Sequence, residues 1–419
     1  MVVPTKKEIL DFSPINRGEK EELPAYKRKS FFEVKKLLES GLIVAITGLR
    51  RVGKTTLMKQ LLEEDAFFFS FDEKRYTNPE TLKRVVEVFL EEKEKPLIAL
   101  DEIFRVDDWA GILKRYHDQK KARFILSGSS SLMVKKGVES LSGRLLTHYL
   151  PPLQFDEYLE LKGESPEKRS LGEAFKIKKR YEEDAQEFLK VGSFPEIVKM
   201  DEKTAVEYIR TSTVEKIVFD DIPSTFRVEY PSKLYDLVKL CATASSRLFT
   251  EVNFAEALQI SRHAISDYLL YLGKAYLVDI LYPMGSFQKA LKKQKKIFVK
   301  TASIYNALAE NPTIGQAVET AVYDKLSEEK ISFYTDPQKR EIDFIWDMPI
   351  EVKYQTIVTR EDMQNLLYYM KKYKKGSGLI VTKDLFDEKK IDGKRISFIP
   401  LDVFLLAEKR HLGRVAEQR

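Results

Sequence analysis

The feature that most constrains this chain is a glycine-bounded loop, GLRRVGKTT, at residues 48–56. The loop follows the apolar run 42–46 and precedes the amphipathic run 57–62. A buried strand, a turn bounded by two glycines and a Lys-Thr pair that opens a helix form the P-loop pattern. Glycines let backbone N–H groups close around phosphate oxygens at a helix N-terminus. The pattern therefore predicts a phosphate-binding loop, and an ordinary glycine-rich turn is the alternative.

Two side chains of this loop would carry the chemistry. Lys54 would neutralise the β- and γ-phosphate oxygens, and the hydroxyl of Thr55 would ligate Mg²⁺. The expected ligands are therefore ATP and Mg²⁺. The residues expected to bind the nucleotide are Gly48, Arg50, Arg51, Val52, Gly53, Lys54, Thr55 and Thr56.

A second motif is the acidic pair Asp101-Glu102, which ends the apolar run 97–100. This arrangement is typical of a Walker B strand. Asp101 would hold Mg²⁺ through water, and Glu102 would act as general base on the attacking water. An acidic pair also commonly marks an ordinary strand exit. The interval from Lys54 to Asp101 leaves room for a helix, a strand and a helix, which favours the catalytic interpretation.

Two further positions are candidates for contact with the γ-phosphate. We expect the strand 123–126 beside the P-loop strand, with Ser127 or Ser129 as a polar sensor. A serine-rich turn that caps the next helix is the alternative. Arg144 is a candidate finger on a neighbouring subunit's nucleotide, because charge spreads over the transferred phosphoryl group. A surface arginine is the alternative there. Lesser candidates for the finger are Arg50, Arg51 and Arg105.

The composition fits a globular chain of several domains. A length of 419 residues with 43% hydrophobic residues suggests roughly two to four domains. The single cysteine, Cys241, excludes an internal disulfide and fits a reducing cytosol. No apolar run reaches the roughly 18 residues of a membrane span, so we expect a cytoplasmic protein without membrane contact. Basic and acidic residues number 71 and 65, so a DNA site would need local clustering of charge.

The region 231–305 has the element order of a winged helix-turn-helix. Helices are expected at 232–244, 254–258 and 262–272, followed by a strand at 275–281. In a DNA reader the third helix would face the major groove, and the lysines of the wing would meet phosphates. The expected DNA contacts are Arg262, His263, Ser266, Lys292, Lys293, Lys295 and Lys296. A solvated lysine-rich hairpin or a protein-docking module is the alternative.

The C-terminal region contains a second set of candidate residues. Strand alternation places Glu351 and Lys353 on one face, and Asp343 lies across a tight turn. Two carboxylates could hold Mg²⁺ while Lys353 orients or activates water, as phosphodiester hydrolysis requires. Glu319 would complete this site. A Glu-x-Lys pattern is frequent in strands rich in Lys and Glu, and the short interval from Asp343 to Glu351 leaves an inactive site as the alternative.

Several segments together resemble a known family. They are residues 48–56, 97–105, 124–131, 142–144, 189–196 and 341–353. The chain resembles the archaeal and bacterial AAA-type ATPases with a C-terminal domain of restriction-endonuclease-like fold. The resemblance implies ATP hydrolysis and a small helical lid that follows the core and closes over the nucleotide. The richness in Lys and Glu also resembles proteins adapted to high temperature.

The sequence as a whole predicts an α/β protein. We expect a P-loop NTPase core of the AAA-like type with a parallel sheet at 1–150, a helical lid or connector at 151–230, the winged helix-turn-helix at 231–305 and the restriction-endonuclease-like domain at 306–419. The leading hypothesis is a Mg²⁺-dependent ATPase that couples ATP hydrolysis to binding or remodelling of DNA, such as branched DNA in repair or recombination. A nucleotide-switched regulator of a protein partner and an ATP-regulated nuclease are the alternatives. A finger at Arg144 would also require a homo-oligomer.

Overall fold

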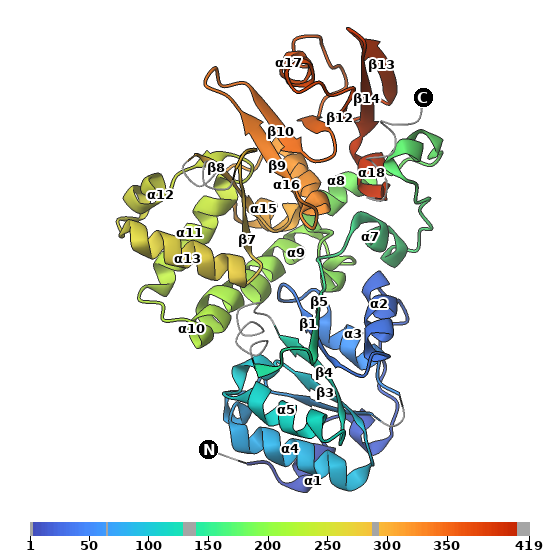
Figure 1. Cartoon of the computed structure of the whole chain (residues 1–419), viewed down its shortest axis with the longest axis vertical. Helices are drawn as coiled ribbons and strands as arrows, with labels where there is room; N and C mark the ends of the chain where they lie inside the picture. The colour runs from blue at the N-terminus through green and yellow to red at the C-terminus, as the bar shows by residue number, and fades with distance from the viewer. Residues whose placement is uncertain (1–2, 64–65, 129–139, 287–292, 409–419) are drawn as a thin grey trace. The chain divides into compact units, whose positions relative to one another are not determined.

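The computed structural model describes residues 3–63, 66–128, 140–286 and 293–408 (Figure 1). These residues form two compact units. The first unit takes the described residues of Met1–Pro152, Lys216–Glu229 and Lys274–Tyr276, and the second those of Leu153–Glu215, Tyr230–Gly273 and Leu277–Arg419. The expected connector at 151–230 is thus divided between the two units. The regions expected to be two further domains, 231–305 and 306–419, lie almost entirely in the second unit.

A five-stranded parallel sheet forms the centre of the first unit. Its strands are β1 (Ile43–Thr47), β2 (Ala66–Ser70), β3 (Leu97–Asp101), β4 (Arg123–Gly128) and β5 (Leu145–Tyr149). Their order across the sheet is β2-β3-β4-β1-β5. All residues of β1 and β3 are buried, as expected for parallel strands with helices on both faces. The predicted neighbour of the P-loop strand is confirmed, because β1 pairs with β4.

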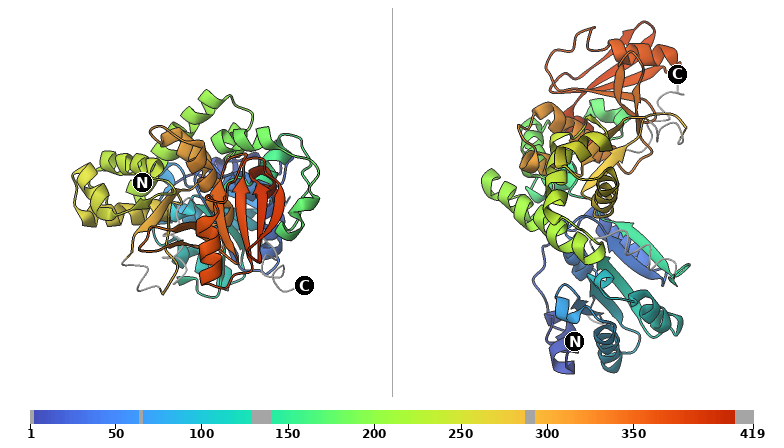
Figure 2. Two further views of the ribbon diagram at one scale, coloured as in Figure 1. Left: turned by 90° about the horizontal axis from the view of Figure 1, so that it is seen from above. Right: turned by 90° about the vertical axis from the view of Figure 1, so that its left-hand side faces the viewer.

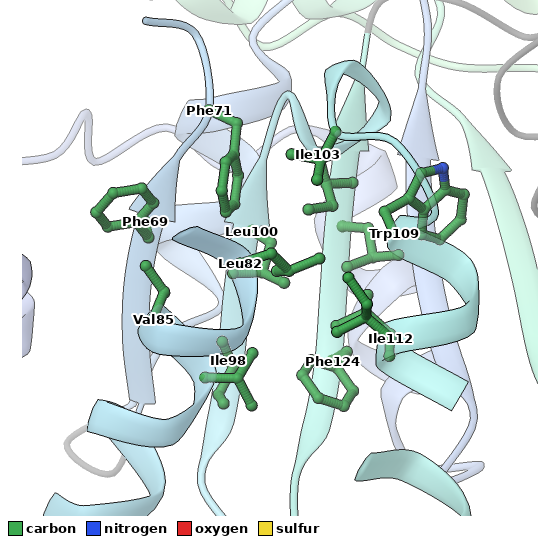
Figure 3. Packing of buried hydrophobic residues seen from close by; sticks show 14 of the residues in the cluster. Phe69, Phe71, Leu82, Val85, Ile98, Leu100, Ile103, Trp109, Ile112 and Phe124 are labelled. Atoms are coloured by element: carbon green, nitrogen blue, oxygen red, sulfur yellow. The ribbon is translucent and has the colours of Figure 1, made fainter. Parts of the chain in front are cut away.

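One face of this sheet packs against α4 (Pro79–Glu92) and α5 (Trp109–Asp118) (Figure 3). Ile98, Leu100 and Phe124 of the strands lie in this core with residues of both helices. Full burial of one such side chain contributes about 1.5–3 kcal/mol to folding. Helix α3 (Lys54–Gln60) instead contacts β1, β3 and β4 outside this core. The strand that ends in the P-loop is therefore held from both sides.

Side chains fix two other local features of the first unit. Asn78 caps α4 by accepting a hydrogen bond from the amide of Thr81 at 2.9 Å, and Pro79 occupies the first helical position. The side chain of Asn16 bonds both backbone groups of Phe68 at 2.9 and 2.7 Å, which covers the exposed edge of β2. The other helical segments of this unit are α1 (Lys6–Leu10), η1 (Pro14–Arg17), α2 (Lys29–Leu38), η2 (Lys74–Tyr76), η3 (Ile103–Arg105), η7 (Ile217–Asp221) and α10 (Ile222–Thr225).

The second unit contains a small antiparallel sheet with three helices before its hairpin. The elements are α11 (Pro231–Thr243), β6 (Leu248–Phe249), α12 (Glu251–Leu258), α13 (Arg262–Lys274), β7 (Val278–Leu281) and β8 (Lys295–Val299). The strand order is β6-β8-β7, so β8 is central. The hydroxyl of Ser261 accepts a hydrogen bond from the amide of Ala264 at the start of α13. The order of helices and strand follows the expectation, and the winged-helix assignment stays a prediction.

A six-stranded mixed sheet forms the C-terminal part of the second unit, drawn in orange to red in Figure 2. The strands are β9 (Ser332–Thr335), β10 (Glu341–Ile345), β11 (Pro349–Lys353), β12 (Ser377–Thr382), β13 (Asp387–Ile391) and β14 (Lys394–Pro400). Their order is β13-β14-β12-β11-β10-β9, with β11, β12 and β14 mutually parallel. Helix α17 (Gln364–Lys372) packs on one face through Leu366 and Met370.

The second unit also contains helical segments outside the elements given so far. They are α7 (Phe155–Leu161), η4 (Leu171–Lys176), α8 (Glu182–Val191), η5 (Pro195–Ile197), α9 (Glu202–Tyr208), η6 (Ile209–Glu215), α15 (Ala302–Leu308), α16 (Ile314–Leu326) and α18 (Leu401–Leu406). The carboxylate of Asp402 ties α18 to the segment before α8, because it accepts two hydrogen bonds from Arg180 at 2.8 and 2.9 Å. None of the helices in the described part of the chain combines the length and apolar character that a bilayer crossing requires.

Candidate functional site

The P-loop connects the end of β1 to the first turn of α3. Gly48 and Gly53 have φ angles of 150° and 94°, which side chains disfavour. A Cβ atom on Gly48 would also collide with the carbonyl group of Leu150. Arg51 lies between them with a φ of 69°. Backbones with such positive φ angles form concave nests that bind anions, so the loop conformation fits a phosphate group.

Lys54 is the first residue of α3, and its side chain is buried. Its Nζ donates hydrogen bonds to the carbonyl oxygens of Gly48 at 3.1 Å and Leu49 at 2.9 Å. Burial lowers the pKa of the ammonium group, and the nearby carboxylates of Glu102 and Asp101 oppose this effect. The ammonium group therefore lies inside the loop, where it can meet phosphate oxygens.

Asp101 is the last residue of β3 and gathers three hydroxyl groups. Its carboxylate accepts hydrogen bonds from Thr55 at 3.0 Å, from Ser70 at 3.4 Å and from Ser127. Burial raises the pKa of Asp101, as does the neighbouring Glu102 carboxylate, while the bonds from Ser127 and Thr55 lower it. The structure thus brings the two predicted metal ligands, Thr55 and Asp101, into direct contact.

Glu102 adopts a backbone conformation that is rare for a residue with a side chain. Its φ and ψ angles of 50° and 30° lie in the left-handed region. Such a conformation costs of order 1 kcal/mol or more and occurs preferentially at functional sites. The charge of Glu102 acts on the pKa values of Lys54, Asp101 and Arg50, so its carboxylate lies among the charged groups of the loop.

The residues at this point fit a magnesium ion. Mg²⁺ prefers hard oxygen ligands, and it is commonly held by one or two protein groups together with water and substrate phosphates. The hydroxyl of Thr55 and the carboxylate of Asp101 offer such oxygen atoms 3.0 Å apart. A bound Mg²⁺ would neutralise charge on the phosphates.

In the second unit, the four residues of the predicted nuclease-like site lie close together. Asp343 accepts a hydrogen bond from the amide of Val352 at 2.9 Å, and the Nζ of Lys353 lies 3.2 Å from the Glu351 carboxylate. Burial and the charge of Asp343 raise the pKa of Glu351 well above its usual value. The same two causes raise the pKa of Glu319 to about 8. The charges of these residues thus act on one another, and a nuclease role for them stays a prediction.

A lysine from outside this set pairs with Asp343 and with a further carboxylate, Glu341. The Nζ of Lys296 lies 2.5 Å from Glu341 and 3.2 Å from Asp343, and only 2% of this side chain is exposed. Burial lowers the pKa of Lys296, but the carboxylates of Asp343 and Glu341 outweigh it and raise the pKa. Within the described residues, no three His, Cys, Asp or Glu side chains are arranged to hold a metal. Lys296 therefore offsets the charge of Asp343, while Lys353 pairs with Glu351.

Lys296 corrects one of the predicted DNA contacts. We expected its side chain on an exposed wing, but β8 is the central strand of the small sheet, and Lys296 is buried there. The neighbouring Lys295 is largely buried and lies 3.6 Å from Glu251. A buried ammonium group with two carboxylate partners cannot reach a DNA phosphate, so the prediction for Lys296 is wrong.

The other predicted DNA contacts have different surroundings. Glu251 accepts hydrogen bonds from Arg262 at 3.1 Å and from Ser266 at 3.0 Å. His263 and Lys293 are exposed to solvent. Lys292 lies outside the described residues. The contacts of Glu251 reduce the positive charge that α13 offers, and DNA binding by this face stays a prediction.

Comparison with known families identifies the region around the P-loop. Residues 40–159 match a family model described as an AAA domain. The chain carries an AAA-type P-loop ATPase domain. This confirms the AAA-type part of the resemblance inferred from sequence. Residues 182–314 and 306–404 match two domains of unknown function, DUF8612 and DUF4143. The winged-helix and restriction-endonuclease-like assignments stay predictions.

Relatives of the chain are themselves uncharacterised. MJ1637 of Methanocaldococcus jannaschii is 27% identical over 409 residues, which cover 87% of this chain and 84% of that protein. An uncharacterised protein of Haemophilus influenzae is 23% identical over 393 residues, covering 86% of this chain and 94% of the relative. The match runs through both units in each case.

Two solved structures are similar at low level. One is a signal transduction ATPase with a tetratricopeptide repeat sensor, PH0952 from Pyrococcus horikoshii, at 13% identity and a TM-score of 0.28 over 74% of this chain and 46% of that chain. The other is the S. cerevisiae Hsp104–ADP complex, at 15% identity and a TM-score of 0.31 over 60% of this chain and 40% of that chain. This chain spans less than half the length of either structure, and both TM-scores are low.

In the AAA domain, Ser127 lies where a polar sensor was expected. It is buried on β4, opposite Ile46 of the P-loop strand, and its hydroxyl donates to Asp101. Ser127 thus belongs to the strand rather than to a helix cap. Ser129, the other candidate, lies outside the described residues. The role of Ser127 as a sensor stays a prediction.

Arg144 lies at the opposite end of the sheet from the P-loop. It immediately precedes β5, whose Leu145 pairs with Ile43 at the start of β1, whereas the P-loop follows the end of β1. The guanidinium group of Arg144 is bound to Asp118 at 2.5 and 3.2 Å. Arg144 therefore cannot reach the P-loop of its own domain, and a finger role in a neighbouring subunit stays a prediction.

One residue of this site was missed by the sequence analysis. Asp221, from the segment Lys216–Glu229 of the first unit, binds both Arg50 at 3.1 Å and Arg105 at 2.8 Å. Arg50 and Arg105 are two of the lesser candidates for a finger. No local motif marks Asp221, since it lies 116 residues beyond Arg105 in a helical run. Its pairing with two arginines is visible only in three dimensions.

Proposed function

We propose that this chain is a Mg²⁺-dependent ATPase that binds and hydrolyses ATP at the P-loop of its AAA domain. The observation that carries the proposal is the 3.0 Å hydrogen bond between the hydroxyl of Thr55 and the carboxylate of Asp101. These two groups would hold the metal. Lys54 and Glu102 supply the ammonium group and the base that phosphoryl transfer to water requires.

Each residue has a separate task in the proposed reaction. The amides of the P-loop and the Lys54 ammonium group bind and orient the phosphates, which aligns the γ-phosphate for attack. Glu102 accepts the proton of the attacking water, and the bond between the β–γ bridging oxygen and the γ-phosphorus breaks. ADP and inorganic phosphate are the products. Mg²⁺, when bound, offsets the negative charge that develops on the phosphate oxygens.

The Mg²⁺ requirement gives a direct test. We expect phosphate release from ATP in Mg²⁺ and none in EDTA. Thr55→Val has nearly the shape of threonine but lacks the metal-binding hydroxyl, so it should lower the rate at least about 10-fold. The matched control Thr55→Ser keeps the hydroxyl and should retain most of the rate. Equal rates for the two variants would contradict the assigned role of Thr55.

We further propose that the second unit binds DNA and that ATP hydrolysis is coupled to this binding. What supports it is a group of exposed ammonium groups at the C-terminal end of α17, namely Lys371, Lys372 and Lys374. Closely spaced lysines release counterions when they meet DNA phosphates. Exposed Arg262 and His263 at the start of α13 offer further polar contacts. The buried Lys296 takes no part in this proposal.

ATPase rates with and without duplex, single-stranded and junction DNA test the coupling. We expect stimulation that weakens as salt rises, because phosphate contacts are salt-dependent. The double variant Lys371→Glu/Lys374→Glu should lose the stimulation, while Lys330→Glu, another exposed position, should keep it. Wild-type ATPase activity without any DNA stimulation or salt-sensitive binding would overturn the DNA proposal. That outcome would favour the alternative function, a nucleotide-switched ATPase that regulates a protein partner.

A further inference from the structure

Asp221 joins two arginines from the two catalytic loops. One oxygen of its carboxylate, Oδ1, lies 3.1 Å from Nη1 of Arg50 and 2.8 Å from Nη2 of Arg105. Arg50 lies inside the P-loop, between its two glycines. Arg105 ends η3, the short helix that begins directly after Glu102. Asp221 therefore connects the P-loop to the segment that follows the Walker B strand.

All three side chains of this group are largely removed from solvent. Their exposed fractions are 18% for Arg50, 19% for Arg105 and 11% for Asp221. Ion pairs at this degree of burial are less screened by water and salt than surface pairs. These ion pairs therefore stabilise the geometry of their side chains more than an exposed surface pair would.

The arginines also have different secondary partners. Arg105 donates to the carbonyl oxygen of Asp72 at 3.1 Å, and its guanidinium group lies 3.3 Å from the Asp72 carboxylate. For Arg50, no hydrogen-bond acceptor among the described residues meets its buried Nε. A buried donor without an acceptor is costly, so this side chain has capacity to bind a further acceptor.

The position of the two arginines fits the phosphate end of the site. The charge of Glu102 raises the pKa of Asp221 and the charge of Lys54 lowers it, so the three groups lie close to one another. Both guanidinium groups line an open cavity of about 700 Å³ in the first unit. They are therefore close to the loop that would bind phosphates and are accessible to a ligand.

Three cations cannot gather at one point without an opposing charge. Like charges that lie close together repel each other more strongly in a partly buried site than in water. Lys54 would bind the phosphates from inside the loop, and Arg50 and Arg105 would add two more positive groups. The carboxylate of Asp221 offsets this repulsion and fixes the direction of both guanidinium groups.

We propose that Asp221 is a positioning residue of the nucleotide site, which holds Arg50 and Arg105 so that they bind the γ-phosphate of ATP and stabilise its transfer. The proposal rests on the proposed ATPase function. It assigns to the arginine pair (Arg50 and Arg105) the role that a finger from another subunit would otherwise have. The arginine pair then distinguishes ATP from ADP, since only ATP has the γ-phosphate.

The alternative is a purely structural ion pair that keeps the segment Lys216–Glu229 on the first unit. A structural role predicts lower stability and an equal loss of affinity for both nucleotides. A positioning role predicts a selective loss for ATP. The ratio of the two affinities therefore separates the two interpretations.

The experiment uses the full chain with Mg²⁺ and compares Asp221→Asn with wild type. We expect the affinity for ADP to change by less than about 2-fold, while the affinity for a non-hydrolysable ATP analogue and kcat each fall at least about 10-fold, as expected when a charge-assisted contact is lost. Asp221→Glu restores the carboxylate and should recover part of kcat. The control Glu229→Gln changes an exposed acid of the same segment that does not line the cavity, and should match wild type.

Several results decide the matter. An equal loss of both affinities, or wild-type behaviour of Asp221→Asn, would overturn the proposal. If Asp221→Asn does not fold, Arg105→Lys gives the same test, because lysine keeps the charge without the forked geometry. That variant should again lose ATP analogue affinity and kcat but keep ADP affinity, and unchanged ratios would overturn the proposal. A wild-type chain without ATPase activity would instead refute the proposed function.

Discussion

The hydroxyl of Thr55 lies 3.0 Å from the carboxylate of Asp101, although the two residues are 46 positions apart in the chain. The parallel order β3-β4-β1 explains this contact, because it brings the carboxyl end of β3 to the loop that follows β1. Ligand sites of open α/β sheets commonly form at these carboxyl ends. The fold itself therefore assembles the residues that would hold Mg²⁺.

Removal of the P-loop ammonium group should abolish tight nucleotide binding. Hydrogen bonds of charged groups contribute about 1.5–3 kcal/mol, so Lys54→Ala should weaken ATP analogue affinity at least about 10-fold. Titration calorimetry measures this change, with circular dichroism as the check on folding. The control Lys36→Ala removes an exposed ammonium group of α2 and should bind normally. Unchanged affinity in Lys54→Ala would contradict the assigned site.

Loss of the buried lysine in the second unit should destabilise that unit. Lys296→Met leaves the carboxylates of Asp343 and Glu341 without their ammonium partner. Removal of one member of a buried ion pair costs about 3–5 kcal/mol, so we expect a loss of about 3 kcal/mol in the free energy of unfolding. Urea unfolding followed by circular dichroism measures this loss. Lys293→Met, at an exposed position nearby, should change stability little. Equal stability of the two variants would show that Lys296 is not an essential partner.

The sequence predicts the residues of the nucleotide site that belong to local motifs, but not the partners that come from distant parts of the chain. The P-loop and the Walker B pair are local patterns, so Lys54, Thr55 and Asp101 were predicted, and the structure brings them together. The two strands that carry Asp343 and Glu351, with a tight turn between them, were likewise predicted.

Lys296 was assigned wrongly and Asp221 was missed, for two physical reasons. A run of lysines normally marks a solvated surface, and nothing local shows that β8 becomes the central strand with Lys296 inside. Asp221 is 171 residues from Arg50, and helical periodicity does not encode a pairing at such a distance. Both residues are charged groups largely removed from solvent, and their partners come from remote segments. Tertiary structure is needed to find such partners.

Glu319 should make the stability of the chain depend on pH. Its pKa is raised to about 8 in the folded chain from the usual 4.5. As pH rises from about 4.5 to 8, the unfolded chain loses this proton first, so the contribution of Glu319 to stability decreases. Glu319→Gln cannot lose the proton. We therefore expect the melting temperature of wild type to fall, relative to Glu319→Gln, over this pH range.

A matched acid provides the control for this titration. Glu310→Gln changes an exposed carboxylate that follows α15 and should run parallel to wild type. Thermal unfolding at several pH values between 4.5 and 8.5 measures all three proteins. A constant difference between wild type and Glu319→Gln across that range would exclude the raised pKa.

Arg144 should have no part in nucleotide binding by its own domain. It lies before β5 at the start of the strands and is bound to Asp118. Exposed ion pairs contribute little to stability, so Arg144→Ala should fold normally. We expect its ATP analogue affinity to stay within about 2-fold of wild type. A loss as large as that of Lys54→Ala would place Arg144 at the phosphates and contradict the described geometry.

The most direct test of the ATPase proposal is single-turnover phosphate release from Mg²⁺-ATP by wild type and Glu102→Gln. The glutamine keeps the shape of the side chain but cannot accept the proton of the attacking water. We predict normal ATP affinity in Glu102→Gln with phosphate release slowed by about 100-fold or more, within the range that general base catalysis contributes. Equal rates for the two proteins, or no binding of ATP by wild type, would contradict the proposed function.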